Sequence, residues 1–276
     1  MTLHDDPVQR HYGGGAILPA ILAALRAAGK DPQRLTLADL APVDEFHVRG
    51  REATIELARH AGLAPGLRVI DVGCGLGGSA RHLVDEHGCT VAGVDLSPDY
   101  IETARALSDL VGLTERVSFH QASALELPFP DASFDLAWTE HVQMNIPDKA
   151  AFYREIVRVI APGGCLVFHD VFAGPGGAPH FPVPWADGPE ISFLAEPEEV
   201  RDLLTALGLK ARVWEDKSAQ TADWFAATLA RLRRKGHPPL GLHLLMGEDT
   251  TRKLENLLRN LREGRVTVVQ AVFVRA

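Results

Sequence analysis

Cysteine is scarce in this sequence. The 276 residues include only Cys74, Cys89 and Cys165, and no two of them have the CxxC spacing. This argues against a disulfide framework or a structural zinc site, and favours three small buried apolar side chains. The 12 histidines are scattered, without an i, i+4 pair beside carboxylates. We therefore predict no metal.

Long apolar runs are also missing. No segment approaches the roughly 20 consecutive apolar residues that a membrane-spanning helix needs. The opening residues, MTLHDDPVQRHYGGG, lack the basic start and apolar run of a signal peptide. A cytoplasmic protein with no membrane partner is the expectation. The hydrophobic share of 46% is enough for a sizeable buried core.

An excess of positive charge is absent as well, because the formal net charge is −8. A protein that binds the phosphate backbone of a nucleic acid usually has a basic face. The one dense basic run, Arg231–Lys235, lies on a predicted helix, where a solvated helix face explains it better. We expect no nucleic-acid partner.

Short apolar runs alternate with amphipathic segments from Leu67 to about Asp170. Such alternation predicts βαβ units, a parallel sheet and right-handed crossovers. Helices are expected at Gly77–Glu86, after the N-cap Ser97, and at Asp148–Ile160. The expected strands are Leu67–Val72, Thr90–Asp95, Val117–Gln121, Phe134–Thr139 and Cys165–Asp170.

The two flanks differ from this central part. Residues 1–65 are predicted to be helical and rich in loops, with Thr36 capping a short helix that has Asp39 at its third position. After the Gly/Pro-rich loop Phe172–Pro189, we expect a helix, a strand, two further helices and a last strand. These are Pro197–Leu207, Lys210–Glu215, two helices within Ala219–Glu263, and Val266–Arg275. We interpret residues 1–276 as one α/β domain: a helical cap (1–65), a core (66–171) and a segment with a helical insertion (172–276).

A glycine-rich turn, Val69–Ala80 (VIDVGCGLGGSA), follows the first expected strand. Glycine permits positive φ and lets a ligand approach the main chain at a helix N-terminus. Gly73, Gly75 and Gly78 satisfy GxGxxG, which by itself suggests a dinucleotide. The match alone has little specificity.

Two acidic residues make the interpretation more specific. Asp71 lies two residues before the first glycine, where a carboxylate would repel a pyrophosphate but would suit a cationic cofactor. Asp95 ends the next strand, where it can bind both hydroxyls of a ribose. The structural alternatives are that Asp71 caps the turn and Asp95 caps the next helix, although Ser97 already fills the second role.

With these motifs the sequence resembles the class I methyltransferases that use S-adenosylmethionine. The resemblance covers about Arg51–Val171 and rests on the order and spacing of four strings: VIDVGCGLGGSA, VAGVDLSPDYIETA, ALELPFPDASFDLAW and IAPGGCLVFHD. It implies a doubly wound, Rossmann-like α/β fold with a seven-stranded, mostly parallel sheet whose last strand is antiparallel. The helical cap is similar to that of the small-molecule branch, which includes sarcosine/dimethylglycine, phosphoethanolamine and quinone methyltransferases.

The resemblance also implies roles for individual residues in binding the cofactor. Relatives often have Asp where Ser123 stands, and a serine hydroxyl is the weaker acceptor for the adenine amino group. Tyr12 resembles an aromatic residue that closes over the cofactor, with an ordinary surface tyrosine as the alternative. The implied cofactor contacts are Gly73, Cys74 and Gly75 at the methionine part, Asp95 at the ribose, and Leu96, Ser123, Ala124 and Leu125 at the adenine.

The reacting end is expected in the polar segment Trp138–Asn145, just past the fourth strand, because ligands of open α/β sheets bind at the carboxyl ends of strands. Glu140 should face the cofactor or the substrate. His141 is the candidate base or orienting group, since imidazole titrates near neutrality; a bond to a loop carbonyl is the alternative. The candidate substrate contacts are Gln143, Asn145, His169 and Trp185.

The predicted function is transfer of a methyl group from S-adenosylmethionine to a small-molecule acceptor, with S-adenosylhomocysteine as the second product. An amine nitrogen is the favoured acceptor, and an oxygen or carbon of a natural product or quinone-like molecule is the alternative. A nicotinamide-dependent reductase and a binding protein without catalysis are more remote. The protein is expected to be a monomer or a homodimer.

Overall fold

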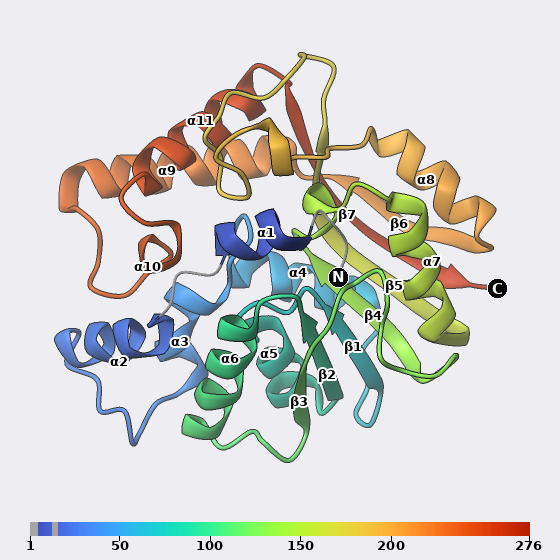
Figure 1. Ribbon diagram of the computed structural model, residues 1–276, viewed down its shortest axis with the longest axis horizontal. Coiled ribbons are helices and arrows are strands. Elements are labelled where there is room, and N and C mark those ends of the chain that lie inside the picture. The colour runs from blue at the N-terminus through green and yellow to red at the C-terminus, as the bar shows by residue number, and fades with distance from the viewer. Residues whose placement is uncertain (1–4, 13–15) are drawn as a thin grey trace.

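The computed structural model describes residues 5–12 and 16–276 and contains one seven-stranded sheet (Figure 1). The strand order is β3-β2-β1-β4-β5-β7-β6. The pairs from β3 to β5 are parallel, and β7 runs antiparallel to both β5 and β6. The strands are β1 (Arg68–Val72), β2 (Thr90–Asp95), β3 (Val117–Gln121), β4 (Phe134–Glu140), β5 (Ile160–Ala173), β6 (Leu209–Asp216) and β7 (Val266–Arg275). The predicted seven-stranded, mostly parallel sheet is confirmed.

Helices cover both faces of the sheet. On one face, Leu57, Leu83 and Ile101 anchor α4, α5 and α6 against apolar residues of the strands. On the other face, Phe152 and Leu204 anchor α7 and α8. These helices are α4 (Arg51–Ala61), α5 (Gly78–His87), α6 (Pro98–Leu110), α7 (Lys149–Val159) and α8 (Pro197–Ala206).

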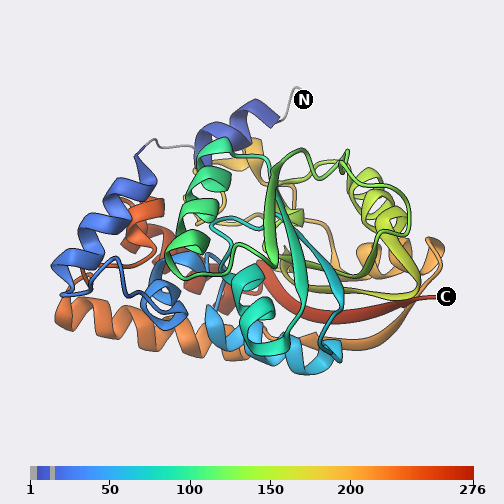
Figure 2. The same cartoon turned by 90° about the horizontal axis from the view of Figure 1, so that it is seen from below.

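The remaining helices form a cap at the carboxyl ends of β1, β2 and β4 (Figures 1 and 2). Ile21 and Leu25 pack with Tyr100 and Leu107 of α6, so the cap shares a core with the sheet domain. No helix in the described residues is both long and apolar enough to cross a membrane. The cap helices are α1 (Asp5–Tyr12), α2 (Ile17–Ala27), α3 (Leu37–Asp44), α9 (Ser218–Lys235), α10 (His243–Met246) and α11 (Thr250–Arg262).

Local signals placed several boundaries correctly. Thr36 and Asp39 form the expected capping box of α3, and the Ser97 hydroxyl accepts the Tyr100 N–H at the start of α6. Two features differ from expectation. The strand β5 begins at Ile160 and not at Cys165, and its pairing with β4 has an irregularity between the pairs Phe134–Ile160 and Leu136–Cys165. The helix α4 was expected in the cap, yet it packs on the sheet.

Candidate active site

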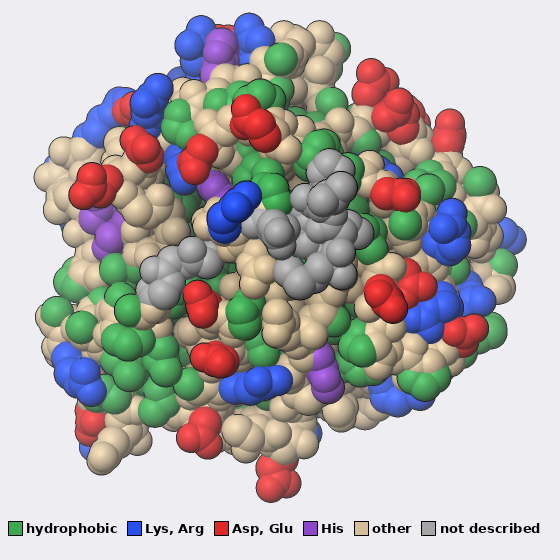
Figure 3. Space-filling model, in the orientation of Figure 1, with side chains coloured by type: hydrophobic (Ala, Val, Ile, Leu, Met, Phe, Trp, Pro, Cys, Tyr) green, Lys and Arg blue, Asp and Glu red, His purple; other side chains and the backbone are tan. Residues whose placement is uncertain are grey.

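A cavity of about 580 Å³ lies where the carboxyl ends of β1, β2 and β4 meet the cap. Its lining comes from the glycine turn, the segment 44–52, the ends of β2 and β4, and the helices α1, α9, α10 and α11. Acidic and basic side chains are interspersed on the outer face that carries α1 (Figure 3). The position agrees with the predicted crevice of an open α/β sheet.

The glycine turn brings backbone to the cavity surface. Gly73 has φ 75°, and a Cβ there would lie 2.1 Å from Cγ2 of Val142, so any side chain would collide. Gly75 has φ 53° and faces open space, since a Cβ there would meet nothing within 4 Å. Its N–H donates to Oδ2 of Asp95 at 2.9 Å. The turn is therefore a cradle in which main chain, not side chain, meets the ligand.

Asp95 lies at the end of β2 and is held by backbone groups. Its Oδ1 accepts the N–H of Ser97 at 2.9 Å, and its Oδ2 accepts the N–H of Gly75. Burial raises the pKa of Asp95, and the hydrogen bonds from the backbone N–H groups of Ser97, Gly75 and Leu96 oppose that shift. The carboxylate keeps further lone pairs toward the cavity, as binding of two hydroxyls requires.

Buried carboxylates gather beneath the turn. Asp71 is 2% exposed, and its Oδ2 has no hydrogen-bond partner among the described residues. Glu140 accepts from Ser79 Oγ at 2.5 Å and Trp138 Nε1 at 2.8 Å through Oε2, while its Oε1 is equally without a partner there. Burial and then the nearby Glu140 raise the pKa of Asp71 well above its usual range. An unpartnered buried carboxylate oxygen is costly unless a cation or a donor fills the space beside it.

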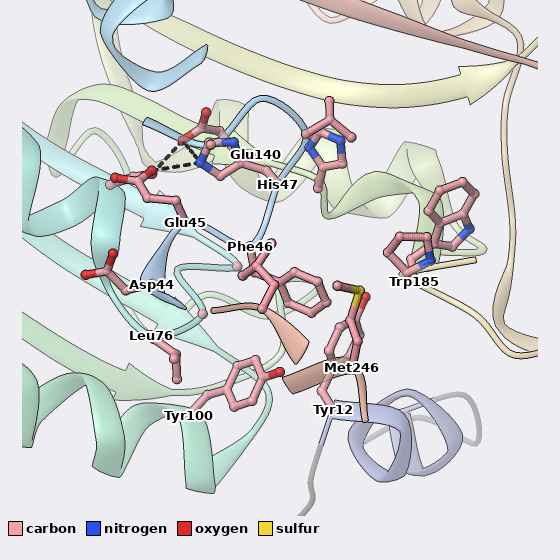
Figure 4. Close-up of a pocket in the computed structure, with 18 of the residues that line it drawn as sticks. Tyr12, Asp44, Glu45, Phe46, His47, Leu76, Tyr100, Glu140, Trp185 and Met246 are labelled. Atoms are coloured by element: carbon pink, nitrogen blue, oxygen red, sulfur yellow. Dashed lines mark hydrogen bonds and ion pairs between the residues drawn. The ribbon is translucent and has the colours of Figure 1, made fainter. Parts of the chain in front are cut away.

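The end of α3 and the residues just after it contribute a histidine and two more acids (Figure 4). His47 Nε2 lies 2.9 Å from Oε2 of Glu45 and 3.6 Å from Oε2 of Glu140. Burial alone would lower the pKa of His47, but Glu140 and Glu45 outweigh it and raise the pKa to about 9. Asp44 pairs with the buried Arg81 at 2.7 Å. Sequence reasoning missed this group; its only signal was the run of charged residues DEFHVRGRE at 44–52.

His141 follows β4 and has an unusual backbone. Its φ is 55°, a region that non-glycine residues rarely adopt, and its N–H donates to the carbonyl of His169 at 2.9 Å. The His141 side chain contributes to the cavity lining, and both of its ring nitrogens are buried without a hydrogen-bond partner among the described residues. Burial, and then His169 and His47, lower the pKa of His141 well below its usual range. The ring is therefore neutral, and its hydrogen-bonding groups are not used by the described residues.

A hydrogen bond between Tyr12 and Asn145 connects the helix α1 to the segment that follows β4. The Tyr12 hydroxyl donates to Oδ1 of Asn145 at 2.8 Å. The Nδ2 group of Asn145 donates to the carbonyls of Trp185 and Ile191, at 2.9 and 2.8 Å. Figure 4 shows Tyr12 beside Phe46 and Met246, which come from two other segments. The amide of Asn145 is therefore fully engaged, and Tyr12 rests against the cavity as a covering residue.

The other predicted site residues divide into two groups. Cys74, Leu96, Ser123, Ala124 and Trp185 line the cavity. Leu125, Gln143 and His169 lie outside its lining. Gln143 Nε2 donates to the carbonyl of Val171 at 2.6 Å, and His169 Nε2 lies 3.2 Å from the carbonyl of Val48. Both side chains therefore hold neighbouring backbone in place.

One group of potential metal ligands occurs in the described residues, outside the cavity lining. It consists of Glu56, His60 and Glu215, whose ligand atoms lie within 4.8 Å of one another. Nζ of Lys217 lies 2.7 Å from Glu56 and 2.5 Å from Glu215. Arg49 also pairs with Glu56 at 2.7 Å, so two cations already pair with the two carboxylates and the group is an ion-pair cluster.

Comparison with known proteins agrees with this geometry. Residues 70–168 match the family described as methyltransferase domain. Tocopherol O-methyltransferase of Arabidopsis thaliana is 44% identical over 100 residues, which are 36% of this chain and 29% of that protein. Glycine/sarcosine/dimethylglycine N-methyltransferase of Actinopolyspora halophila is 26% identical over 219 residues, covering 79% of this chain and 38% of that protein. The chain spans less than half the length of the curated relatives it matches first.

The likeness in fold extends over the whole chain. The crystal structure of geranyl diphosphate C-methyltransferase from Streptomyces coelicolor A3(2) superposes with a TM-score of 0.73 at 19% identity, covering 100% of this chain and 99% of that one. The glycine turn, Asp95 and the cavity thus occur in a fold that methyltransferases use. Residues 70–168 of the chain match a methyltransferase domain, and the chain as a whole has the fold of geranyl diphosphate C-methyltransferase.

Proposed function

We propose that this protein transfers the methyl group of S-adenosylmethionine to a small-molecule acceptor. The observation that carries the proposal is the pair of buried carboxylates, Asp71 and Glu140, beneath the glycine turn. Asp71 and Glu140 each have a carboxylate oxygen without a partner among the described residues. A dinucleotide would bring a pyrophosphate to this place, whereas S-adenosylmethionine brings an ammonium and a sulfonium, which such carboxylates stabilise.

The chain's residues fit the cofactor along its length. Asp95, oriented by two backbone N–H groups, supports binding of the ribose hydroxyls. Gly75 faces open space beside the turn, which supports binding of the methionine part. Leu96, Ser123 and Ala124 line the cavity on the adenine side. The bound cofactor supplies an electrophilic methyl group with a neutral thioether as leaving group.

The protein's share of the reaction is positioning and exclusion of water. Neutral His141 can accept a hydrogen bond from an N–H or O–H of the acceptor and so direct the acceptor's lone pair. Its pKa is too low for it to be protonated near neutral pH, so this acceptor role is constantly available. Tyr12, bonded to Asn145, covers the site from the side of α1.

An amine is the acceptor class that we propose. Aromatic side chains of Phe46, Trp185 and Trp224 line the same cavity as the buried carboxylates. Aromatic faces and carboxylates both favour the positive charge that develops on nitrogen as it is methylated, with about 0.5–2 kcal/mol for each cation–π contact.

The direct test is incubation of the protein with S-adenosylmethionine and a panel of amines, phenols and enolisable carbonyl compounds. We expect S-adenosylhomocysteine and an N-methylated product, both measured by mass spectrometry, with the amines. Methylation confined to oxygen or carbon acceptors would refute the amine assignment. Absence of turnover together with absence of cofactor binding would refute the methyltransferase itself.

A further inference from the structure

Basic side chains gather at the cap end of the cavity. Arg231 near the end of α9, His237 in the following loop and His243 at the start of α10 all contribute to the lining. In Figure 1 this part of the cap lies beside α2, away from the sheet. The lining carboxylates belong to a different part of the chain; they are Asp44, Glu45, Glu52, Asp71, Asp95 and Glu140. The lining residues from α9 to α11 thus include no carboxylate, whereas the acidic residues lie in the segment 44–52 and at the ends of β1, β2 and β4.

Arg231 differs from the other arginines of the lining. Arg49 pairs with Glu56 at 2.7 Å, and Arg51 forms an ion pair with Glu45. On α9 itself, Arg233 pairs with Glu255 at 2.7 Å. Arg231 has no ion pair or hydrogen bond within residues 5–12 and 16–276, although six carboxylates line the same cavity. Its guanidinium is therefore available to a ligand.

The two histidines, which line the same cavity as Arg231, form a pair with each other. The ring centroids of His237 and His243 lie 5.0 Å apart, with planes inclined by 38°. His237 Nε2 lies 3.2 Å from the hydroxyl of Thr251. Burial and the neighbouring His237 lower the pKa of His243. An anion between the rings and Arg231 would receive N–H donors from three side chains, since each imidazole can donate.

The wall between the two ends is apolar. Trp224, Phe225, Met246, Leu254 and Leu257 line this stretch, and the last four are buried in one hydrophobic cluster. These side chains line the same cavity as His141 and Arg231, so a ligand that contacts both residues is expected to meet them. Its middle part is therefore expected to be apolar.

We propose that the methyl acceptor carries an anionic group, a carboxylate or a phosphate, at the end remote from the methylated atom, and that Arg231 binds it together with His237 and His243. The proposal rests on the proposed function and specifies its substrate class. The planar guanidinium suits both oxyanions, because each can accept two parallel N–H bonds.

Calorimetric titration of the protein loaded with S-adenosylhomocysteine provides the test. The probes are phenylacetate, phenylbutyrate and phenylhexanoate, each paired with the alcohol of equal length, and phenylbutyl phosphate represents the second anion. We expect at least one anion to bind about tenfold more tightly than its alcohol, and Arg231→Gln to remove that preference. Arg234→Gln, three residues along the same basic run and outside the cavity lining, is the control and should keep it.

The outcomes separate this proposal from the one it rests on. If S-adenosylhomocysteine binds but no anion exceeds its alcohol, or if Arg231→Gln leaves the preference unchanged, the anion site is refuted and the methyltransferase remains. If S-adenosylhomocysteine does not bind, the proposed function fails as well. A preference for the phosphate over all carboxylates would identify which oxyanion the site takes.

Discussion

At the scale of single residues, Gly73, Gly75 and Asp95, the proposed cofactor contacts, lie together at the cavity. The two glycines belong to one strand–turn–helix unit and Asp95 ends the next strand, so their spacing was visible in the sequence. The group of Glu45 and His47 was not predictable, because Glu140, which lies 3.6 Å from His47, is remote in sequence and only the fold brings it there. Gln143 and His169 were placed at the right strand ends, but their side chains turn toward backbone carbonyls.

His141 yields a prediction about pH. Because its pKa lies well below the usual range, the ring stays neutral from about pH 8 to about pH 6, and the rate should show no loss from its protonation there. His141→Gln should lower kcat by about 100-fold if the ring orients the acceptor. Steady-state kinetics over this pH range, with His180→Gln in the outer loop as control, provide the measurement. A wild-type acid limb near pH 6.5 that vanishes in His141→Gln would contradict this account.

At the scale of elements, periodicity and caps identified the seven strands and the main helices. The short helix α10 was missed, because four residues are too few to show a helical period. The helix α1 was not assigned separately for a similar reason, because it has only 8 residues. Its packing depends on contacts with segments that are remote in sequence. His11 and Tyr12 attach it, through the carbonyl of Pro184 at 3.1 Å and through Asn145.

The attachment of α1 can be tested with Tyr12→Phe. This change removes the hydrogen bond to Asn145 but keeps the ring contacts with Phe46 and Tyr100. We expect the Kd for S-adenosylhomocysteine to rise about two- to tenfold, the usual effect of one hydrogen bond. Tyr153→Phe removes a hydroxyl from α7, outside the cavity lining, and should leave the Kd unchanged. An unaltered Kd in Tyr12→Phe would show that α1 does not cover the cofactor.

At the scale of the whole molecule, cap and sheet are one cooperative unit in our interpretation, because α2 and α6 share a core. Buried ionisable groups connect the segment 44–52 to the glycine turn and to β4. The protonation state of this group therefore enters the stability of the entire fold.

The stability of the protein without cofactor should fall at alkaline pH. The pKa of His47 is raised from 6.5 to about 9 in the folded state, so its contribution is complete below about pH 6.5 and disappears as the pH rises through about 9. The shift corresponds to about 3 kcal/mol in the free energy of unfolding. Urea titrations should show this decline in the wild type and in the control His87→Gln. A decline of equal size in His47→Gln would exclude His47 as its source.

The central claim is that the buried carboxylates Asp71 and Glu140, beneath the glycine turn, select a cationic cofactor. Equilibrium titration of the purified protein with S-adenosylmethionine and, separately, with NAD⁺ tests it most directly. The account predicts saturable binding of S-adenosylmethionine at micromolar concentrations and no binding of NAD⁺ in that range. Micromolar binding of NAD⁺ without binding of S-adenosylmethionine would contradict it.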